Sequence, residues 1–187
     1  MSSRRGGNSG VRILAGRWKG RRLDAPPASR PTSARAREAL FDLLGNRIEG
    51  SRVLDLYAGS GAVGLEAVSR GASRAVLVES EAAALRRTVA RVGASGEEVR
   101  VIERGAAAAI DDLIREGEGF DIVFADPPYD LSPKDAGVGR VARLMTPEGI
   151  FVFQRDGTTE APPEVAGLRL LRHREYGRNV FYFFGML

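Results

Sequence analysis

The segment RVLDLYAGSGAVGLEA, residues 52–67, passes from an apolar run into a helix-like pattern through a glycine-rich turn. Gly59, Gly61 and Gly64 follow GxGxxG spacing, and Glu79 ends the next apolar run twenty residues after Gly59. Such glycines let a ligand approach the turn closely, and an acid at this distance can accept hydrogen bonds from ribose hydroxyls. The segment therefore predicts a ribose-bearing cofactor, the alternative being a tight strand-to-helix turn without any ligand.

Strand and helix patterns alternate on both sides of this turn. Alternation of near-continuous apolar strands with helices indicates a parallel sheet that is covered on both faces. A helix is predicted over 33–45, with Ser33 as its N-cap. The predicted strands are 52–57, 74–79, 98–103, 120–125 and 149–154, and further helices are predicted near 62–70, 81–93, 105–116 and 133–145.

The C-terminal pattern differs, because LRLLRHREY and NVFYFFGM are joined by Gly177 and Arg178 alone. A connection this short permits a hairpin but no crossover, so the last strand is expected to be antiparallel. The predicted fold class is α/β, a Rossmann-like seven-stranded sheet that is mostly parallel. We expect Phe181 to Phe184 to lie in the sheet core, and His173 to be a surface or packing residue and not a catalyst.

The amino-acid composition excludes several kinds of functional site. The 187 residues suit one domain, and the absence of Cys together with a single His excludes disulfides, a thiol nucleophile and a Cys/His zinc site. We expect no metal, although carboxylates alone can bind one. The apolar runs are shorter than a membrane span, and MSSRRGGNSG lacks an apolar signal core. We expect a soluble, cytoplasmic monomer with no membrane partner.

The charge is unevenly placed along the chain. Residues 1–37 carry a net charge of +9, and the other 150 residues carry −5. A basic arm on an acidic body favours a polyanionic partner over a merely solvated tail. We divide the chain into a disordered basic tail (1–10), a basic β-hairpin arm with its connector (11–32) and a catalytic domain (33–187). We also expect that a protein lacking residues 1–24 would still fold. Trp18 is expected to pack in the hairpin, and the candidate residues for binding such a polyanion are Arg17, Lys19, Arg21, Arg22, Arg35 and Arg37.

The stretch ADPPYD, residues 125–130, ends the fourth predicted strand with an acid and two prolines. Pro127 and Pro128 cannot extend a sheet ladder, and both bias the preceding residue toward an extended backbone. The resulting stiff elbow holds the Asp126 carboxylate and the Tyr129 ring in place, unless Asp126 is merely a strand-end turn residue. Because Asp55 before the glycine turn disfavours a pyrophosphate and suits an ammonium, S-adenosylmethionine is favoured over NAD.

DLYAGSGAVGLEA, LVES and ADPPY together resemble the amino-methyltransferases of the class I S-adenosylmethionine fold. RILAGRWKGRRL and RPTSARAREALFDLL extend the resemblance to the RsmD-type guanine-N2 methyltransferases of bacterial small-subunit ribosomal RNA, over nearly the whole chain. Arg30 and Thr32 are either helix-entry residues or, as the resemblance implies, RNA-binding residues near the cofactor and the target base. Gly105 departs from the Asp or Asn often found at its position, so Ala106 and backbone N–H groups are expected at the adenine. The cofactor-binding candidates are Asp55, Tyr57, Gly59, Ser60, Gly61, Glu79, Ser80, Gly105 and Ala106.

The elbow suits methylation of an exocyclic amine. Attack on a methyl group requires the guanine amine to become tetrahedral, and acceptors fixed around its two N–H bonds favour that geometry. The catalytic candidates are the Asp126 carboxylate, the Pro127 carbonyl, the rigid Pro128 and Tyr129, which would stack on an extracted base. The expected partner is ribosomal RNA or the assembling small subunit. A DNA or protein amino-methyltransferase, an NAD-dependent oxidoreductase and a non-catalytic RNA-binding factor remain alternatives.

Overall fold

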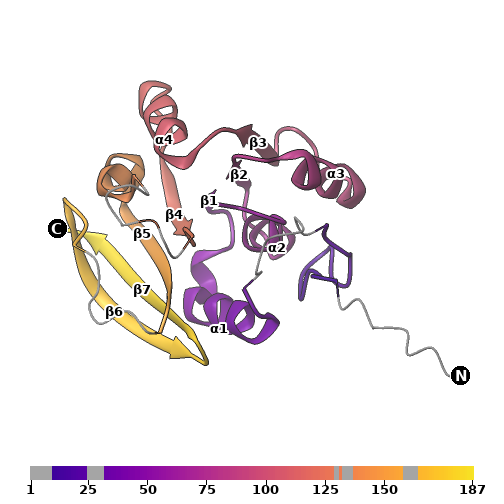
Figure 1. Ribbon diagram of the computed structural model, residues 1–187, viewed down its shortest axis with the longest axis horizontal. Helices are drawn as coiled ribbons and strands as arrows, with labels where there is room; N and C mark the ends of the chain where they lie inside the picture. The colour runs from indigo at the N-terminus through magenta and orange to yellow at the C-terminus, as the bar shows by residue number, and fades with distance from the viewer. Residues whose placement is uncertain (1–9, 25–31, 129–130, 132–136, 158–163) are drawn as a thin grey trace, which may run out of the picture.

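The computed structural model describes residues 10–24, 32–128, 131, 137–157 and 164–187 (Figure 1). Its seven-stranded sheet has the order β3-β2-β1-β4-β5-β7-β6. The first four strands are β1 (Arg52–Leu56), β2 (Arg74–Glu79), β3 (Val99–Glu103) and β4 (Phe120–Ala125), and they pair in parallel. The others are β5 (Met145–Asp156), β6 (Leu168–Tyr176) and β7 (Asn179–Met186).

The order of strands reverses between β1 and β4. The chain runs outward from β1 to β2 and β3, and then returns to place β4 on the other side of β1. Loops at the carboxyl ends of β1 and β4 therefore leave in opposite directions and open the crevice in which such sheets bind ligands. Strand β7 pairs antiparallel with both β5 and β6, which confirms the predicted reversal of the last strand.

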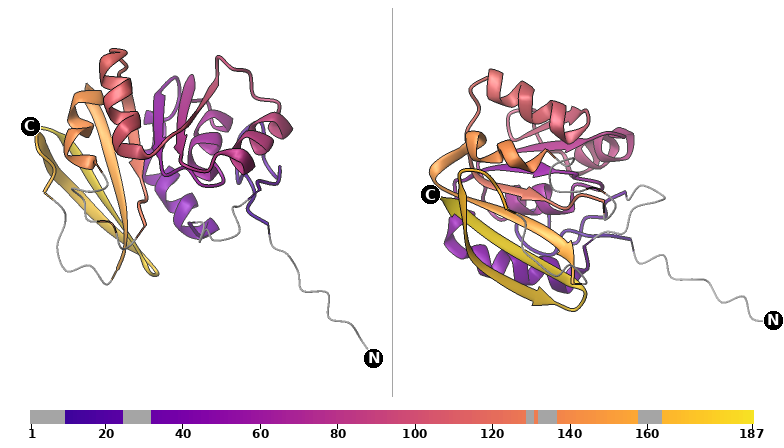
Figure 2. Two further views of the ribbon diagram at one scale, coloured as in Figure 1. Left: turned by 45° about the horizontal axis from the view of Figure 1, so that its top comes forward. Right: turned by 60° about the vertical axis from the view of Figure 1, so that its left-hand side comes forward.

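Helices cover both faces of the sheet, as predicted. Figure 2 shows α1 (Ala34–Leu44) and α4 (Ala106–Arg115) on opposite faces. Side chains alternate along the strands, so Val53 joins the core shared with α1, α2 (Ala62–Ser69) and α3 (Ala83–Val92), while Leu54 joins the core under α4. The predicted N-cap is confirmed, since the Ser33 hydroxyl accepts a bond from the Ala36 N–H at 3.2 Å.

The predicted helix over 133–145 is wrong in its described part. Residues Val138–Leu144 form a 3-10 helix, η2, and Met145 already belongs to β5; residues 133–136 lie outside the described part. Gly137 has a left-handed φ of 73°, and Gly139 has low helix propensity, which together disfavour a regular α-helix here. A second short 3-10 helix, η1 (Gly45–Arg47), follows α1.

The predicted hairpin arm is part of the main body. The two halves of the arm pair antiparallel: Arg12 lies opposite Arg22, and the Leu23 N–H donates to the Val11 carbonyl at 2.8 Å. Ile13, Trp18 and Leu23 are buried in the core shared with α2. Trp18 thus packs as expected. The expectation that residues 1–24 are dispensable for folding is therefore corrected, because their removal would delete three core side chains and expose the apolar surface on which they pack. Residues 1–9 of the predicted tail (1–10) and residues 25–31 of the predicted connector lie outside the described residues.

The described residues contain no helix long and apolar enough to cross a bilayer. Phe181, Phe183 and Phe184 are buried as expected, and the Tyr182 side chain lies with them. His173 is exposed on β6, also as expected.

Candidate active site

The glycine turn after β1 has an unusual backbone. Tyr57 is the one described non-glycine residue with a positive φ, 63°, and Gly59 and Gly61 are also left-handed. A bulky residue in this region costs roughly 1 to 3 kcal/mol, which the surrounding packing has to offset. Such strain is common where a backbone is shaped for a ligand.

The three motif glycines serve different purposes. A Cβ at Gly64 would lie 2.1 Å from Leu77 Cδ2, and one at Gly61 would lie 2.6 Å from Leu85 Cδ1. These two glycines therefore allow α2 to pack closely on its neighbours. A Cβ at Gly59 would meet nothing within 4 Å, so open space borders the turn at this position.

Glu79 joins the ends of β1 and β2. One of its oxygens accepts a bond from the Gly59 N–H at 2.7 Å, and the other accepts bonds from the Ser80 N–H at 2.8 Å and the Ser80 hydroxyl at 3.1 Å. A carboxylate offers about four lone-pair sites. A ribose hydroxyl can therefore bind Glu79 by replacing a weakly held donor such as the Ser80 hydroxyl.

Asp55 is a buried acid at the base of the turn, with 1% of its surface exposed. Burial raises its pKa to about 7; the Gly64 N–H, 2.8 Å from Oδ2, opposes this, and the charges of Asp126 and Glu79 add to it. Among the described residues no Lys, Arg or His forms an ion pair with Asp55. A buried carboxyl without a counter-charge fits a cationic ligand group such as an ammonium.

Asp126 follows β4 directly, and its partner comes from far along the chain. Thr32 Oγ1 lies 3.3 Å from Asp126 Oδ2 and 3.2 Å from Gln154 Oε1. Burial raises the pKa of Asp126 to about 7, while the Thr32 bond and the charge of Arg155 act against that rise. The structure thus brings Thr32 to the proposed catalytic acid.

Gln154 and Asn179 extend this contact and were missed by the sequence reasoning. The Gln154 amide donates to Asn179 Oδ1 at 3.0 Å, and Gln154 is 2% exposed. Pairing of Phe153 with Ala125 places Gln154 beside Asp126. The polar residue at the end of the predicted strand 149–154 was a usable signal for Gln154, whereas Asn179 on the returning strand carried none.

The elbow itself is described in part. Pro127 is buried and Pro128 is exposed. The Pro128 carbonyl accepts the Leu131 N–H at 3.1 Å and is thus engaged, so the Pro127 carbonyl remains the candidate acceptor for a substrate amine. Tyr129, the predicted stacking residue, lies outside the described residues.

The remaining cofactor candidates lie on the loops around the turn. Gly105 is the exposed N-cap of α4, Ala106 is the buried first residue of that helix, and Ser60 is buried inside the glycine turn. The Arg104 N–H donates to the Glu79 carbonyl at 3.1 Å, which holds the loop before α4 next to the end of β2. The described residues hold no group of three His, Cys, Asp or Glu side chains suited to a metal ion.

One basic candidate is wrong. Arg37 is 1% exposed, lies 3.4 Å from Glu66 Oε2 through its Nε, and donates to the Arg12 carbonyl at 2.7 Å. Burial lowers the pKa of its guanidinium, while the charge of Glu66 raises it. A side chain enclosed in this way joins the arm to α1 and α2 and cannot reach an RNA phosphate.

The other basic candidates lie at the surface, apart from Arg30, which is outside the described residues. Arg17 pairs with Glu98 at 2.6 Å and stacks on Trp18, and Arg21 donates to the Val92 carbonyl at the end of α3. Lys19, Arg22 and Arg35 are exposed and form no ion pair within the described residues. Among the candidate basic residues, these three side chains are therefore the most available for contact with phosphate groups.

Comparisons with known proteins show which family the chain is similar to. The model of the family described as Conserved hypothetical protein 95 matches residues 11–185. Ribosomal RNA small subunit methyltransferase D of Escherichia coli K12 is 39% identical over 126 residues, which are 66% of this chain and 62% of that protein. The YlbH protein of Bacillus subtilis 168, provisionally named an rRNA methyltransferase, is 30% identical over 89% of this chain and 94% of its own. The solved structure of yhhF from Escherichia coli, provisionally named a methyltransferase, superposes with a TM-score of 0.80 at 29% identity, over 94% of this chain and 97% of that one.

Proposed function

This chain belongs to the Conserved hypothetical protein 95 family of RsmD-type ribosomal RNA methyltransferases, and we propose that it methylates N2 of a guanine in small-subunit RNA. S-adenosylmethionine supplies the methyl group when bound. The observation that carries the proposal is the meeting of Asp55, Glu79 and Asp126 at the carboxyl ends of neighbouring strands, where the charges of Asp126 and Glu79 help to raise the pKa of Asp55.

The residues of this chain have separable tasks in the proposed reaction. Asp55 faces the cationic end of the cofactor, Glu79 faces its ribose, and Gly59 leaves room beside the turn. Asp126 and the Pro127 carbonyl accept the two N–H bonds of the target amine, which fixes its lone pair toward the methyl group. The Thr32 hydroxyl, 3.3 Å away, orients the Asp126 carboxylate.

Asp126 can also act in the proton transfer that follows methylation. Methylation leaves a positive charge on the amine nitrogen, and this is relieved by loss of one proton. With a pKa of about 7, the Asp126 carboxylate can receive that proton or pass it to water. The RNA is positioned by Lys19, Arg22 and Arg35, and we place the enzyme in the cytoplasm as a monomer that acts on ribosomal RNA or the assembling small subunit.

Small subunits and naked ribosomal RNA from a strain lacking the gene are the test substrates. After incubation with labelled S-adenosylmethionine, nucleoside mass mapping should show one N2-methylguanosine. Asp126→Asn should lower the rate by ~10²–10³ and change cofactor affinity by no more than a few fold. Label that enters DNA or protein but not RNA would refute the proposed substrate, and wild-type turnover by Asp126→Asn would refute the role of the elbow.

A further inference from the structure

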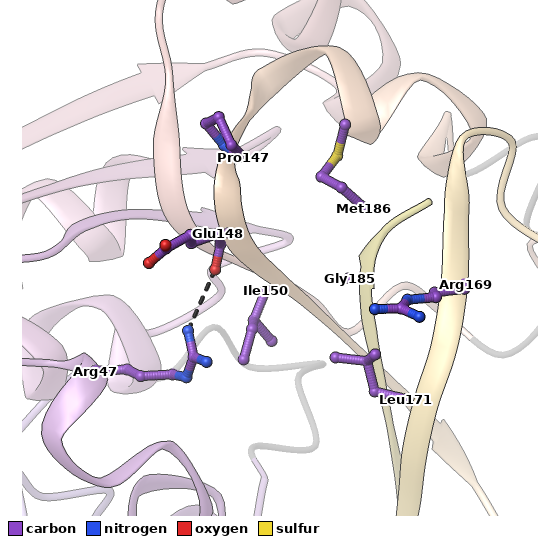
Figure 3. A pocket seen from close by; sticks show the side chains of 9 residues that line it. Arg47, Pro147, Glu148, Ile150, Arg169, Leu171, Gly185 and Met186 are labelled. Atoms are coloured by element: carbon purple, nitrogen blue, oxygen red, sulfur yellow. Dashed lines mark hydrogen bonds between the residues drawn. The ribbon is translucent and has the colours of Figure 1, made fainter.

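A cavity of about 370 Å³ lies at the other end of the sheet from Asp126 (Figure 3). Its walls come from η1, from the beginning of β5, and from β6 and β7. Strand β5 runs five residues from Gln154 back to Gly149, which at roughly 3.3 Å per residue is roughly 17 Å. The cavity is therefore separate from the proposed methylation site.

Two guanidinium groups border this cavity from opposite sides. Arg47 lies on η1 and Arg169 lies on the edge strand β6, and both are exposed. Figure 3 shows Ile150 and Leu171 between them, while the Glu148 carboxylate points away from Arg169. Arg47 donates to the Glu148 carbonyl at 3.2 Å, which leaves most of its N–H donors available.

The cations at this corner differ from those at the opposite edge of the sheet. Around β3 and α4, Arg100 pairs with Glu116 and Arg115 pairs with Asp112. Within the described residues, Arg47 and Arg169 form no ion pair with any carboxylate. Neighbouring Arg172 likewise has a backbone carbonyl, that of Leu43 at 2.9 Å, as its hydrogen-bond acceptor.

A strand irregularity shapes the apolar wall. The register of β6 against β7 shifts between Leu170 and Arg172, and the intervening Leu171 lies over Gly185 with 48% of its surface exposed. Bulges that re-aim a side chain are frequent next to functional sites. Charged residues also protect edge strands from unwanted pairing, but Arg47 lies on η1 and that role does not account for it.

From this arrangement we infer a second RNA-binding site, in which Arg47 and Arg169 bind the phosphate backbone and Leu171 contacts an adjoining ribose. Guanidinium groups bind phosphate through paired, charge-assisted hydrogen bonds. The inference rests on the proposed function, because it takes the polyanion to be the substrate RNA. It adds that the RNA extends over the surface of the protein from the Asp126 site to the far corner of the sheet, since β5 between them is buried.

The test compares two double variants of equal charge. Arg47→Gln with Arg169→Gln alters the cavity, whereas Arg100→Gln with Arg115→Gln removes the same charge at the opposite edge. Binding of naked small-subunit RNA is measured across a salt series. We expect the cavity variant to bind about tenfold more weakly and its salt slope to fall by about 0.7 to 0.9 for each phosphate contact that is lost. The control variant should stay within twofold of the wild type.

Several results would overturn the inference. Equal losses in both variants would indicate general attraction by charge, and a loss seen with assembled subunits but not with naked RNA would indicate a protein ligand. The single variant Arg169→Gln controls for misfolding of the double variant, because the Arg169 side chain makes no hydrogen bond within the described residues. Wild-type protein that binds cofactor but neither binds nor methylates RNA would remove the proposed function as well. Normal RNA binding by the cavity variant would remove this site alone.

Discussion

Replacing Thr32 by Val removes the hydroxyl that contacts Asp126 and preserves the shape of the side chain. Thr32 Oγ1 carries one proton, which it can donate to Asp126 Oδ2 or to Gln154 Oε1 at any moment. The bond to Asp126 favours the ionised carboxylate and lowers its pKa, while burial raises that pKa to about 7. Thr32→Val should therefore raise the pKa of Asp126 further.

The size of this effect can be worked from the distance. A hydrogen bond to a charged group contributes about 1.5 to 3 kcal/mol, and the 3.3 Å separation places this bond at or below the lower limit. About 1.4 kcal/mol corresponds to one pH unit. At pH 7 the ionised fraction of Asp126 would then fall from about one half to about one tenth, a loss of about fivefold in activity.

The assay is kcat/KM for RNA methylation between pH 6 and 9.5. The acidic limb should move up by about one pH unit in Thr32→Val, and activity should recover at high pH. Thr32→Ser keeps the hydroxyl and should follow the wild-type profile. A loss that is equal at every pH, or an acidic limb that does not move, would refute the idea that Thr32 acts through the ionisation of Asp126.

Calorimetry should show one S-adenosylmethionine or S-adenosylhomocysteine per chain and no comparable NAD binding. Proton release should accompany binding of S-adenosylmethionine or S-adenosylhomocysteine, because the ammonium of the ligand lowers the raised pKa of Asp55. Tight NAD binding without proton release would contradict the cofactor assignment. The melting temperature of the unliganded protein should fall as pH rises from about 4 to 8. The folded-state pKa of about 7 for Asp55 and Asp126 exceeds the unfolded value of about 3.9. Folding therefore takes up protons between these pH values, and a rise in pH destabilises the folded state. Asp126→Asn should weaken that decline, and a pH-independent melting temperature would exclude the raised pKa values. Trp18→Ala should lower the free energy of unfolding in urea by about 3 to 5 kcal/mol, because Trp18 is only 6% exposed. The control variant, Lys19→Gln with Arg22→Gln, should leave the free energy of unfolding within about 0.5 kcal/mol of the wild type. Equal losses in both variants would mean that the arm is not a structural element.

The interactions that hold the arm and the elbow join residues far apart in the chain. Thr32 meets Asp126 across 94 residues, and the arm N–H of Trp18 donates to the Ser69 hydroxyl across 51. A local pattern carries no information about such partners, because they depend on how whole elements pack. For the same reason, the excess of positive charge in residues 1–37 could not distinguish the buried Arg37 from the exposed Arg22.

The sequence by itself determined the order and type of the strands, the glycine turn and the elbow at Asp126, because side-chain periodicity and the backbone limits of glycine and proline act over a few residues. It also indicated the reversal of β7, since a two-residue connection excludes a crossover. The tertiary structure alone decided that the arm completes the core, that Arg37 pairs with Glu66 inside it, and that Gln154 and Asn179 support Thr32. Burial and hydrogen-bond partners are properties of the packed assembly of distant segments, and they exist only once the sheet has brought those segments together.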